Sequence, residues 1–273
     1  IPLRLVGSEM CIRDRMGAYI LAAFWVLPLL YAFWAAFHYS NDAIHFNIFS
    51  PLTLDNFREA WSQAPFLRYG LNTFLLVSFI LPGQLLISTL AAYAFVRFKF
   101  SGANVAFALV LVQLMITPEI LIVQNYVTLS KLGLVDTITG MGLPYVASAF
   151  CIFLLRQTFK SIPKELEDAA ELEGCSTMGI LWKVYVPLAT PTFIAFSLVS
   201  VSHHWNNFLW PLIISNSVET RPLTVGLGIF GSPETGVDWS IMSAATLISV
   251  APLLIAFLIF QKQFVQSLSL IHI

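Results

Sequence analysis

The sequence predicts an all-α integral membrane protein with about six transmembrane helices. Hydrophobic residues make up 58% of the 273-residue chain and charged residues only 11%, whereas soluble domains carry about 25% charged residues. Mean hydropathy is +0.79. Long apolar stretches recur along the chain, and they lack the period-two alternation of a transmembrane β-barrel.

The expected membrane-spanning stretches have the length of about 20 apolar residues that a helix needs to cross a bilayer. No linker separates them, so we expect one membrane domain. Pro82, which precedes Gly83, and Pro118 are expected to kink the helices that contain them. The stretches lie near residues 17–38, 70–95, 104–125, 138–158, 190–214 and 241–261.

The two ends of the chain look foreign to this domain. Residues 10–15 (MCIRDR) can be encoded by DNA whose reverse complement encodes LSLIHI, the sequence of residues 268–273. Such an inverted repeat resembles the adapter ends of a transposon-prepared sequencing library. We therefore expect residues 1–15 and 268–273 to be non-native, adapter-derived segments and residues 16–267 to be the membrane domain.

A polar island interrupts the apolar sequence at residues 161–174 (SIPKELEDAAELEG), where five of the fifteen acidic residues lie within nine positions. If the island is cytoplasmic, seven Lys and Arg residues of the membrane domain fall inside and four outside. An excess of basic residues on cytoplasmic loops is the usual pattern in membrane proteins. We therefore expect the island to form a cytoplasmic loop.

The island has the start and stop signals of a helix-turn-helix. Pro163 suits the first position of a helix, and Gly174 suits its left-handed end. Ser176 can cap a second helix that runs towards Pro187. An outside loop at residues 40–66 is expected to hold a further short helix, with Asp55 as its N-cap.

One face of the first island helix combines small and acidic residues. Leu166, Ala169, Ala170 and Glu173 follow the i, i+3, i+4, i+7 spacing of a shared face, and the two alanines would let a partner's surface approach closely. The residues alone leave open whether this helix docks on a partner or is an ordinary amphipathic surface hairpin.

The island is similar to the EAA loop of ATP-binding-cassette importer permeases, in which Glu-Ala-Ala is followed after three residues by Gly. Here the pattern reads Asp168, Ala169, Ala170 and Gly174, so the first acid is shorter by one methylene. In that family the loop is the coupling helix, which docks in a cleft of the ATPase subunit. The resemblance implies that Glu165 and these four residues couple the chain to an ATPase.

Four further stretches resemble the carbohydrate branch of that family, specifically its maltose-type second permease subunit: residues 90–98 (LAAYAFVRF), 132–137 (LGLVDT), 205–212 (WNNFLWPL) and 221–227 (RPLTVGL). The resemblance implies a multi-pass subunit of a bacterial cytoplasmic (inner) membrane importer for a mono- or oligosaccharide or a sugar derivative such as glycerol phosphate. Its implied partners are a second homologous permease, two ATP-binding subunits and an extracytoplasmic solute-binding protein.

The chain is expected to be a transport subunit and not an enzyme. No phosphate-binding G-x-x-x-x-G-K-[ST] sequence occurs, so any ATP hydrolysis belongs to a separate chain. The three cysteines follow no metal or disulfide spacing, and nothing indicates a cofactor. Net charge is −1, which gives no indication of nucleic-acid binding.

Four polar residues in the apolar stretches are candidates for the substrate pathway: Glu119, His204, Asn206 and Asn207. Polar groups inside a membrane mark a pathway or a contact between helices. Amides can bond to sugar hydroxyls, and neighbouring aromatic rings can stack on the apolar sugar face. The alternatives are hydrogen bonds between helices for His204 and the two asparagines, and a helix end for Glu119.

Other functions remain open at this point. The chain could import another solute, such as a polyamine, an amino acid or phosphate, and solute-binding assays would separate these. An ion-coupled secondary transporter would need no ATPase, but it would be expected to carry several carboxylates in its spans. A membrane enzyme lacks support because no nucleophile–base pair or paired acids stand out.

Overall fold

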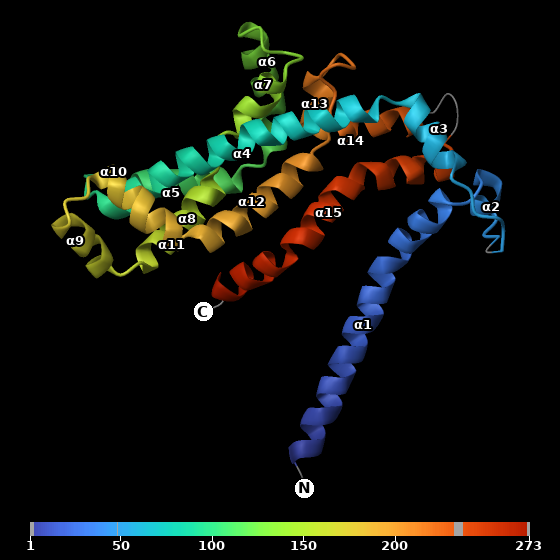
Figure 1. Cartoon of the computed structure of the whole chain (residues 1–273). Helices are drawn as coiled ribbons and strands as arrows, with labels where there is room; N and C mark the ends of the chain where they lie inside the picture. Colours follow the sequence, from blue (N-terminus) through green and yellow to red (C-terminus); the bar gives the residue numbers. More distant parts are fainter. Residues whose placement is uncertain (1–2, 48, 232–236, 272–273) are drawn as a thin grey trace. The chain divides into compact units, whose positions relative to one another are not determined.

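The structure is a computed structural model that describes residues 3–47, 49–231 and 237–271, with side chains for residues 16–47, 49–231 and 237–259. Every regular element within these ranges is a helix (Figure 1), which confirms the predicted fold class. Three helical segments are long and apolar enough to cross a membrane: Met16–Ala36, Phe66–Arg97 and Trp239–Ile259. Three bent helix pairs raise the number of spans to as many as six.

The chain divides into two units, of which the first comprises residues 1–65 and 227–251. It contains α1 (Leu3–Ala36), α2 (Ser40–Ile44), α3 (Asp55–Gln63), η5 (Leu227–Gly231) and the beginning of α15 (Trp239–Ile271). The side-chain amide of Asn56 donates hydrogen bonds to the carbonyls of Ala36 and His38, at 2.9 and 2.8 Å. These two bonds satisfy carbonyls at the end of α1 and hold α3 against it.

The short helix expected in the 40–66 loop is confirmed, but its N-cap is not Asp55. Leu54 precedes the helix, and Asp55 is its first residue. The Asp55 carboxylate accepts a hydrogen bond from the Thr53 hydroxyl at 3.0 Å, and the Thr53 hydroxyl in turn accepts from the Asp55 N–H at 3.1 Å. Thr53 therefore supplies the capping oxygen that the sequence assigned to Asp55.

The second unit comprises residues 66–226 and 252–273, and α4 (Phe66–Arg97) runs through it. This helix contacts α7, α8, α12 and α14. The other elements are α5 (Ala103–Val112), η1 (Gln113–Met115), η2 (Pro118–Leu121), α6 (Ile122–Lys131), α7 (Ile138–Gly142), η3 (Leu143–Tyr145), α8 (Ala149–Ser161), α9 (Lys164–Leu172), α10 (Thr177–Ile180), the π-helical turn η4 (Leu181–Tyr185), α11 (Val186–Leu188), α12 (Thr190–Trp205), α13 (Leu209–Ile214) and α14 (Leu223–Gly226).

Three of the expected spans are broken helices. Ala103–Met115 and Pro118–Lys131 meet at 91°, which confirms the predicted kink at Pro118, whereas α4 runs unbroken through Pro82. Ile138–Tyr145 and Ala149–Ser161 meet at 47°. The third pair, Thr177–Leu188 and Thr190–Trp205, meets at 73°. At the first break, Pro118 begins the second segment, and its missing N–H prevents the helical ladder from continuing across the break.

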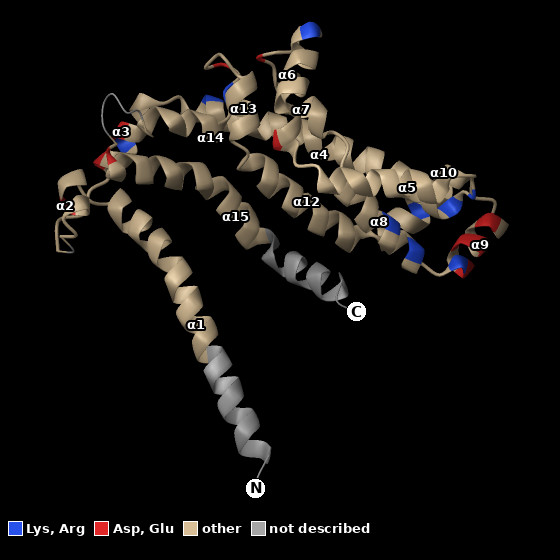
Figure 2. Ribbon diagram, turned by 180° about the vertical axis from the view of Figure 1, so that it is seen from behind, with Lys and Arg blue, Asp and Glu red and all other residues tan. Residues whose placement is uncertain are grey.

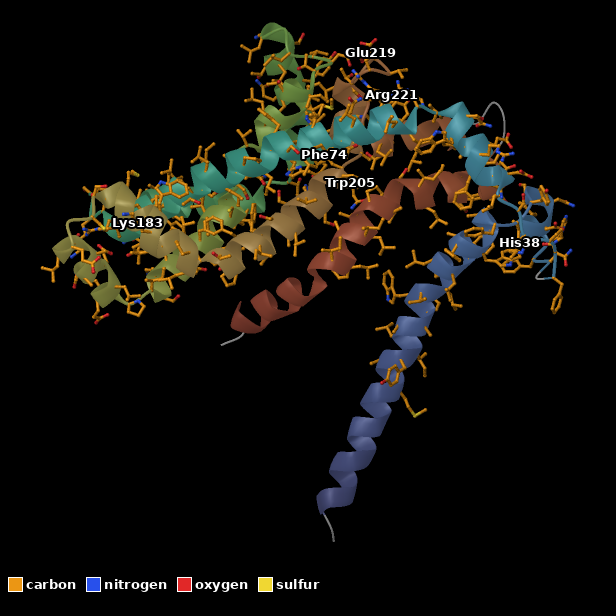
Figure 3. The ribbon with its side chains drawn as sticks, in the orientation of Figure 1. His38, Phe74, Lys183, Trp205, Glu219 and Arg221 are labelled. Carbon is orange, nitrogen blue, oxygen red and sulfur yellow. The ribbon has the colours of Figure 1, made fainter. Side chains whose placement is uncertain are left out.

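The stretch predicted as one span at residues 190–214 is not a single continuous helix, and the candidate span found there comprises Thr177–Leu188 and Thr190–Trp205. α12 stops at Trp205, which Figure 3 labels at its end, and Asn206 is the C-cap. The carbonyl of Ser202 accepts two hydrogen bonds from Asn206, one from its backbone N–H at 3.2 Å and one from its side-chain amide at 2.8 Å. Hydropathy marks residues 190–214 as apolar, but it does not reveal that the helix is interrupted between α12 and α13.

Two buried clusters pack against different parts of α4. One joins Tyr93 of α4 to residues of α8, α9, η4 and α12. The other joins Leu76 and Ile80 of α4 to residues of α6, α7 and α13. The helix therefore links the α9 region near its C-terminal end to the α6, α7 and α13 region nearer its N-terminal end (Figure 1).

The prediction that residues 1–15 and 268–273 are adapter-derived concerns segments whose side chains lie outside the described residues. It stays a prediction.

Candidate functional site

The α9 helix ends as its sequence predicts. Gly174 has a φ of 78°, a left-handed conformation that glycine adopts without a Cβ penalty. The N–H of Cys175 bonds to the carbonyl of Ala170 at 3.0 Å, and the N–H of Gly174 bonds to that of Glu171 at 2.9 Å. This pair of bonds is a Schellman motif. Ser176 then accepts a hydrogen bond from the N–H of Gly179 at 3.2 Å and caps α10, as expected.

The start of α9 differs from the prediction by one residue. Pro163 is extended and precedes the helix as its N-cap, and Lys164 is the first helical residue. Glu165 and Glu167 still lie in the first turn, where acids interact favourably with the positive end of the helix.

The buried carboxylate of Glu167 fastens α9 to the rest of its unit. Its side chain is only 6% exposed, and its Oε1 lies 2.5 Å from Nε of Arg97 at the end of α4. The other oxygen, Oε2, accepts a hydrogen bond from the Tyr185 hydroxyl at 2.5 Å. Arg97 also pairs with Glu171 one turn further along α9. Two acids of α9 therefore share one guanidinium.

The π-helical turn η4 supplies the tyrosine of this anchor. Pro187 has no N–H for the carbonyl of Lys183, so the regular ladder is interrupted at this point. Tyr185, the last residue of the turn, packs edge-to-face against Tyr93 and Phe159, with ring centroids 5.1 and 5.2 Å away. The rings exclude water from the Glu167 carboxylate, which strengthens its charged hydrogen bonds.

The face of α9 opposite Glu167 is exposed, and it is called the free face below. Glu165, Asp168 and Ala169 are exposed, and Leu172 is 91% exposed. Ala170, by contrast, is only 8% exposed and packs in the cluster with Tyr93 and Phe159. The two alanines therefore have different roles: Ala169 lies on the free face, and Ala170 packs inside the chain.

Charges gather around α9, as Figure 2 shows. The acids of α9 lie near the basic end of α8, whereas most of the unit carries uncharged residues. Lys183, on the η4 turn, is exposed and is labelled in Figure 3. An exposed acidic helix face beside basic residues is suited to a protein surface that carries both charges.

A polar pocket of about 460 Å³ lies where η2, η3, α12 and α13 meet. Three predicted pathway residues line it: Glu119, Asn206 and Asn207. The sequence did not single out Tyr145 and Ser202, which also line it, and His203 joins them. Tyr145 lies far from these residues in the sequence, so no local pattern places it beside them.

The fourth predicted residue, His204, lies behind the pocket. The residue is only 6% exposed, and its Nε2 lies 3.3 Å from Nε2 of Gln84 on α4. Gln84 also donates to the carbonyl of Tyr145 at 2.9 Å and accepts from the Ser200 hydroxyl at 2.5 Å. This network joins α4, α12 and η3, so the structure gives His204 contacts between helices.

A close approach allows this network to form. A Cβ on Gly83 would lie 3.2 Å from Cβ of Val146, so glycine lets the turn after η3 pack directly on α4. Trp210 of α13 fixes the other wall by donating from Nε1 to the carbonyl of Met141 at 2.9 Å.

Asp136 joins the 132–137 loop to the loop after α13. Its carboxylate accepts hydrogen bonds from the N–H groups of Asn216 (2.8 Å) and Ser217 (3.1 Å) and from the Thr220 hydroxyl. Partial burial raises the pKa of Asp136, but these hydrogen bonds outweigh burial and hold the pKa at about 2, below the ordinary 3.8.

The same loop is also tied to α4. Asn72 donates from its side-chain amide to the carbonyls of Glu219 and Arg221, at 2.8 and 2.9 Å. Figure 3 labels both loop residues. The loop after α13 is therefore held both by Asp136 and by Asn72 of α4.

The fold is that of a helical membrane protein. Its long helix α4 contacts both the exposed, anchored helix α9 and the residues that support the polar pocket. Broken helices around an internal polar site are typical of transport proteins. The chain belongs to the family of binding-protein-dependent transport system inner membrane components, which it matches over residues 18–270.

Several relatives are known by name. The chain is 34% identical over 260 residues to the arabinooligosaccharides transport system permease protein AraQ of Halalkalibacterium halodurans, covering 93% of each chain. It is 32% identical over 222 residues to the sn-glycerol-3-phosphate transport system permease protein UgpE of Shigella flexneri, covering 79% of each.

Among solved structures, the chain is similar to one in the crystal structure of a bacterial ABC transporter involved in the import of the acidic polysaccharide alginate. The TM-score is 0.81 at 22% identity, and the match covers 94% of this chain and 97% of that one. At this identity the likeness shows a common fold.

Replacing Arg97 by Ala is expected to loosen α9 while leaving the rest of the chain folded. Removing one partner of a buried ion pair costs about 3–5 kcal/mol, and the 28% exposure of Arg97 places this pair at or below the lower end. Amide hydrogen exchange across residues 164–172 should therefore accelerate by up to about a hundredfold.

The matched control is Lys99→Ala, which removes an exposed basic residue two positions away. It should leave exchange in α9 unchanged. Equal protection of α9 in the Arg97 variant and the control would show that the ion pair does not hold the helix.

The Asp136 clasp is expected to weaken in acid. Its folded pKa is about 2 and that of an unfolded aspartate is about 3.9. A depressed folded pKa contributes stability that is complete above the unfolded value and disappears as pH falls towards the folded value. Exchange of amides in residues 214–220, corrected for intrinsic rates, should accelerate between about pH 4 and pH 2.

Asp136→Asn provides the matched control, because Asn also tolerates the positive φ of 60° at this position. It should lower protection at neutral pH and remove this acid-dependent component. An unchanged pH profile in the Asn variant would contradict the assignment of the transition to Asp136.

Proposed function

We propose that the chain is a permease subunit of an ATP-driven bacterial carbohydrate importer in the cytoplasmic (inner) membrane. Its partners in this proposal are a second homologous permease, two ATP-binding subunits on separate chains and an extracytoplasmic solute-binding protein. Family membership supports the transport role, and relatives named for arabinooligosaccharides and glycerol phosphate support the substrate class.

The observation that carries the proposal is the two-sided arrangement of α9. One side is fastened to α4 and η4 through Glu167, and the other side exposes Glu165, Asp168 and Ala169. This face suits docking in a cleft of the ATPase subunit, where the acids meet basic groups.

In the proposed cycle, ATP binding closes the pair of ATPase subunits and displaces α9. Arg97 passes this displacement to α4, which also carries the Gln84 network behind the pocket. The pocket then changes its access from the inside to the outside, and the binding protein releases its sugar. Hydrolysis resets the cycle, and the chain itself performs no bond chemistry.

Ala169 and Ala170 offer a direct test, because they are adjacent but differ in burial: Ala169 is exposed, and Ala170 packs in the core cluster. Ala169→Trp should leave the amount and melting temperature of the assembled permease unchanged while abolishing capture of the ATPase and ATP-driven uptake. The reason is that a large ring on the free face prevents close approach. The measurement is co-purification of the ATPase together with sugar uptake in proteoliposomes.

Ala170→Trp is the internal comparison. It overpacks the buried cluster, which typically costs about 1–3 kcal/mol, so it should lower the melting temperature of the permease. Normal ATPase capture and uptake by a stable Ala169→Trp protein would refute the docking role of this face. Uptake that needs no ATPase and collapses with an ion gradient would instead favour a secondary transporter.

A further inference from the structure

The pocket lies at two interruptions of the helical backbone. The 91° bend before Pro118 forms one wall, and the break between α12 and α13 at residues 206–208 forms another. Irregular backbone at membrane depth is tolerated where it is buried in protein or lines a water-filled cavity. A volume of about 460 Å³ falls within the range of about 300–1,000 Å³ that is usual for small-molecule sites.

The polar groups that line this pocket suit hydroxyl ligands. Glu119 offers a carboxylate that can accept two hydrogen bonds, and Asn206 and Asn207 offer amides that both donate and accept. Tyr145 and Phe208 add aromatic rings for the apolar face of a sugar. The lining therefore combines both kinds of contact that a sugar ring makes.

The pocket has one acidic residue and no strongly basic one. Among the described residues that line it, Glu119 is the carboxylate, His203 is the other titratable group, and none is a lysine or arginine. Phosphate and carboxylate ligands are usually held by arginine or lysine. The last turn of the 16-residue α12 also ends here, and the C-terminal end of a helix carries partial negative charge. The short helices η2 and α13, of four and six residues, begin nearby and offset this only weakly.

We infer that this pocket binds an uncharged sugar unit of the transported carbohydrate and that Glu119 is its specificity-determining residue, excluding sugar phosphates and sugar acids. The inference rests on the carbohydrate function proposed above. Glu119 accepts hydrogen bonds from sugar hydroxyls and repels an anionic substituent at the same place. Its exposed position within the cavity leaves both oxygens available to a ligand.

The pocket is held rigidly enough to discriminate. Gln84 and His204 support the wall that carries Tyr145, and the indole of Trp210 is fixed to Met141. A site whose wall positions are set by a second layer of hydrogen bonds loses little entropy when a ligand binds.

The test uses the assembled permease and ATPase complex in nanodiscs without the binding protein, so that only the permeases select the ligand. The probes are arabinotriose, which is neutral, and trigalacturonate, which is anionic and of comparable size. Binding is followed by the part of the tryptophan fluorescence change that is lost in a Trp210→Phe variant, since Trp210 lines the pocket.

The native complex should bind arabinotriose at least about tenfold more tightly than trigalacturonate, and Glu119→Lys should reduce that preference by about tenfold or more. Glu119→Gln, which keeps hydrogen-bonding capacity, should retain arabinotriose binding while admitting more trigalacturonate. The matched control is Glu59→Lys, an equal charge change at an exposed residue of α3, and it should preserve the native preference.

Equal or tighter binding of trigalacturonate by the native complex would overturn the inference while leaving carbohydrate import standing. The same preference in the Glu119→Lys and Glu59→Lys complexes would also overturn it, as would failure of both probes to bind. A different result would contradict the carbohydrate function itself: the complex would then take up a solute that is not a carbohydrate in an ATP-driven manner.

Discussion

The carboxylate of Glu167 is the group on which the position of α9 depends. A nine-residue helix is too short to be stable by itself, and α9 buries little besides Ala170 and Glu167. Its place is therefore set by polar contacts more than by apolar area. Arg97 neutralises the buried charge from α4, and Tyr185 donates to it from η4. Removing either partner would leave a charge in a place that excludes water.

This anchor makes α4 the common member of both candidate surfaces. Arg97 at its C-terminal end holds α9, and Gln84 within the same helix supports the pocket. Thirteen residues separate the two positions, which corresponds to about 20 Å along the axis of an α-helix. A continuous helix of this length transmits a displacement without a separate chain of side-chain contacts. In the proposed importer, this is how events at the ATPase reach the sugar.

The sequence predicted the fold class, the α9 helix and its glycine turn because hydropathy and capping residues are local signals. It assigned the cap of α3 to Asp55 where Thr53 supplies the oxygen, and it did not predict that α12 ends at Trp205. It also placed Ala169 and Ala170 together on one docking face, because helical spacing shows which residues are neighbours but not which of them the rest of the protein covers. The acid that anchors the helix, Glu167, stands beside Asp168 of the recognised motif, and nothing local distinguishes the two.

The pocket, too, could be predicted from the sequence only in part. Glu119, Asn206 and Asn207 could be named from the sequence because polar residues are conspicuous in apolar spans. Gln84 and Tyr145 could not be assigned to them, since their proximity follows from the packing of α4 against η3 and α12. The contact of His204 with Gln84 also depends on the packing of α12 against α4, which no local pattern shows.

The central claim is that α9 and the end of α4 move as one body when the ATPase closes. The most direct measurement is the distance between spin labels at Lys164, the first residue of α9, and Lys99 just beyond α4, both of which are exposed. It would be made on the complex in proteoliposomes, with and without a non-hydrolysable ATP analogue. The account predicts one narrow, unchanged distance distribution in the two states. A shift of about 5 Å, one helical turn, or a broad distribution in either state would show that α9 moves independently of α4 and would contradict it.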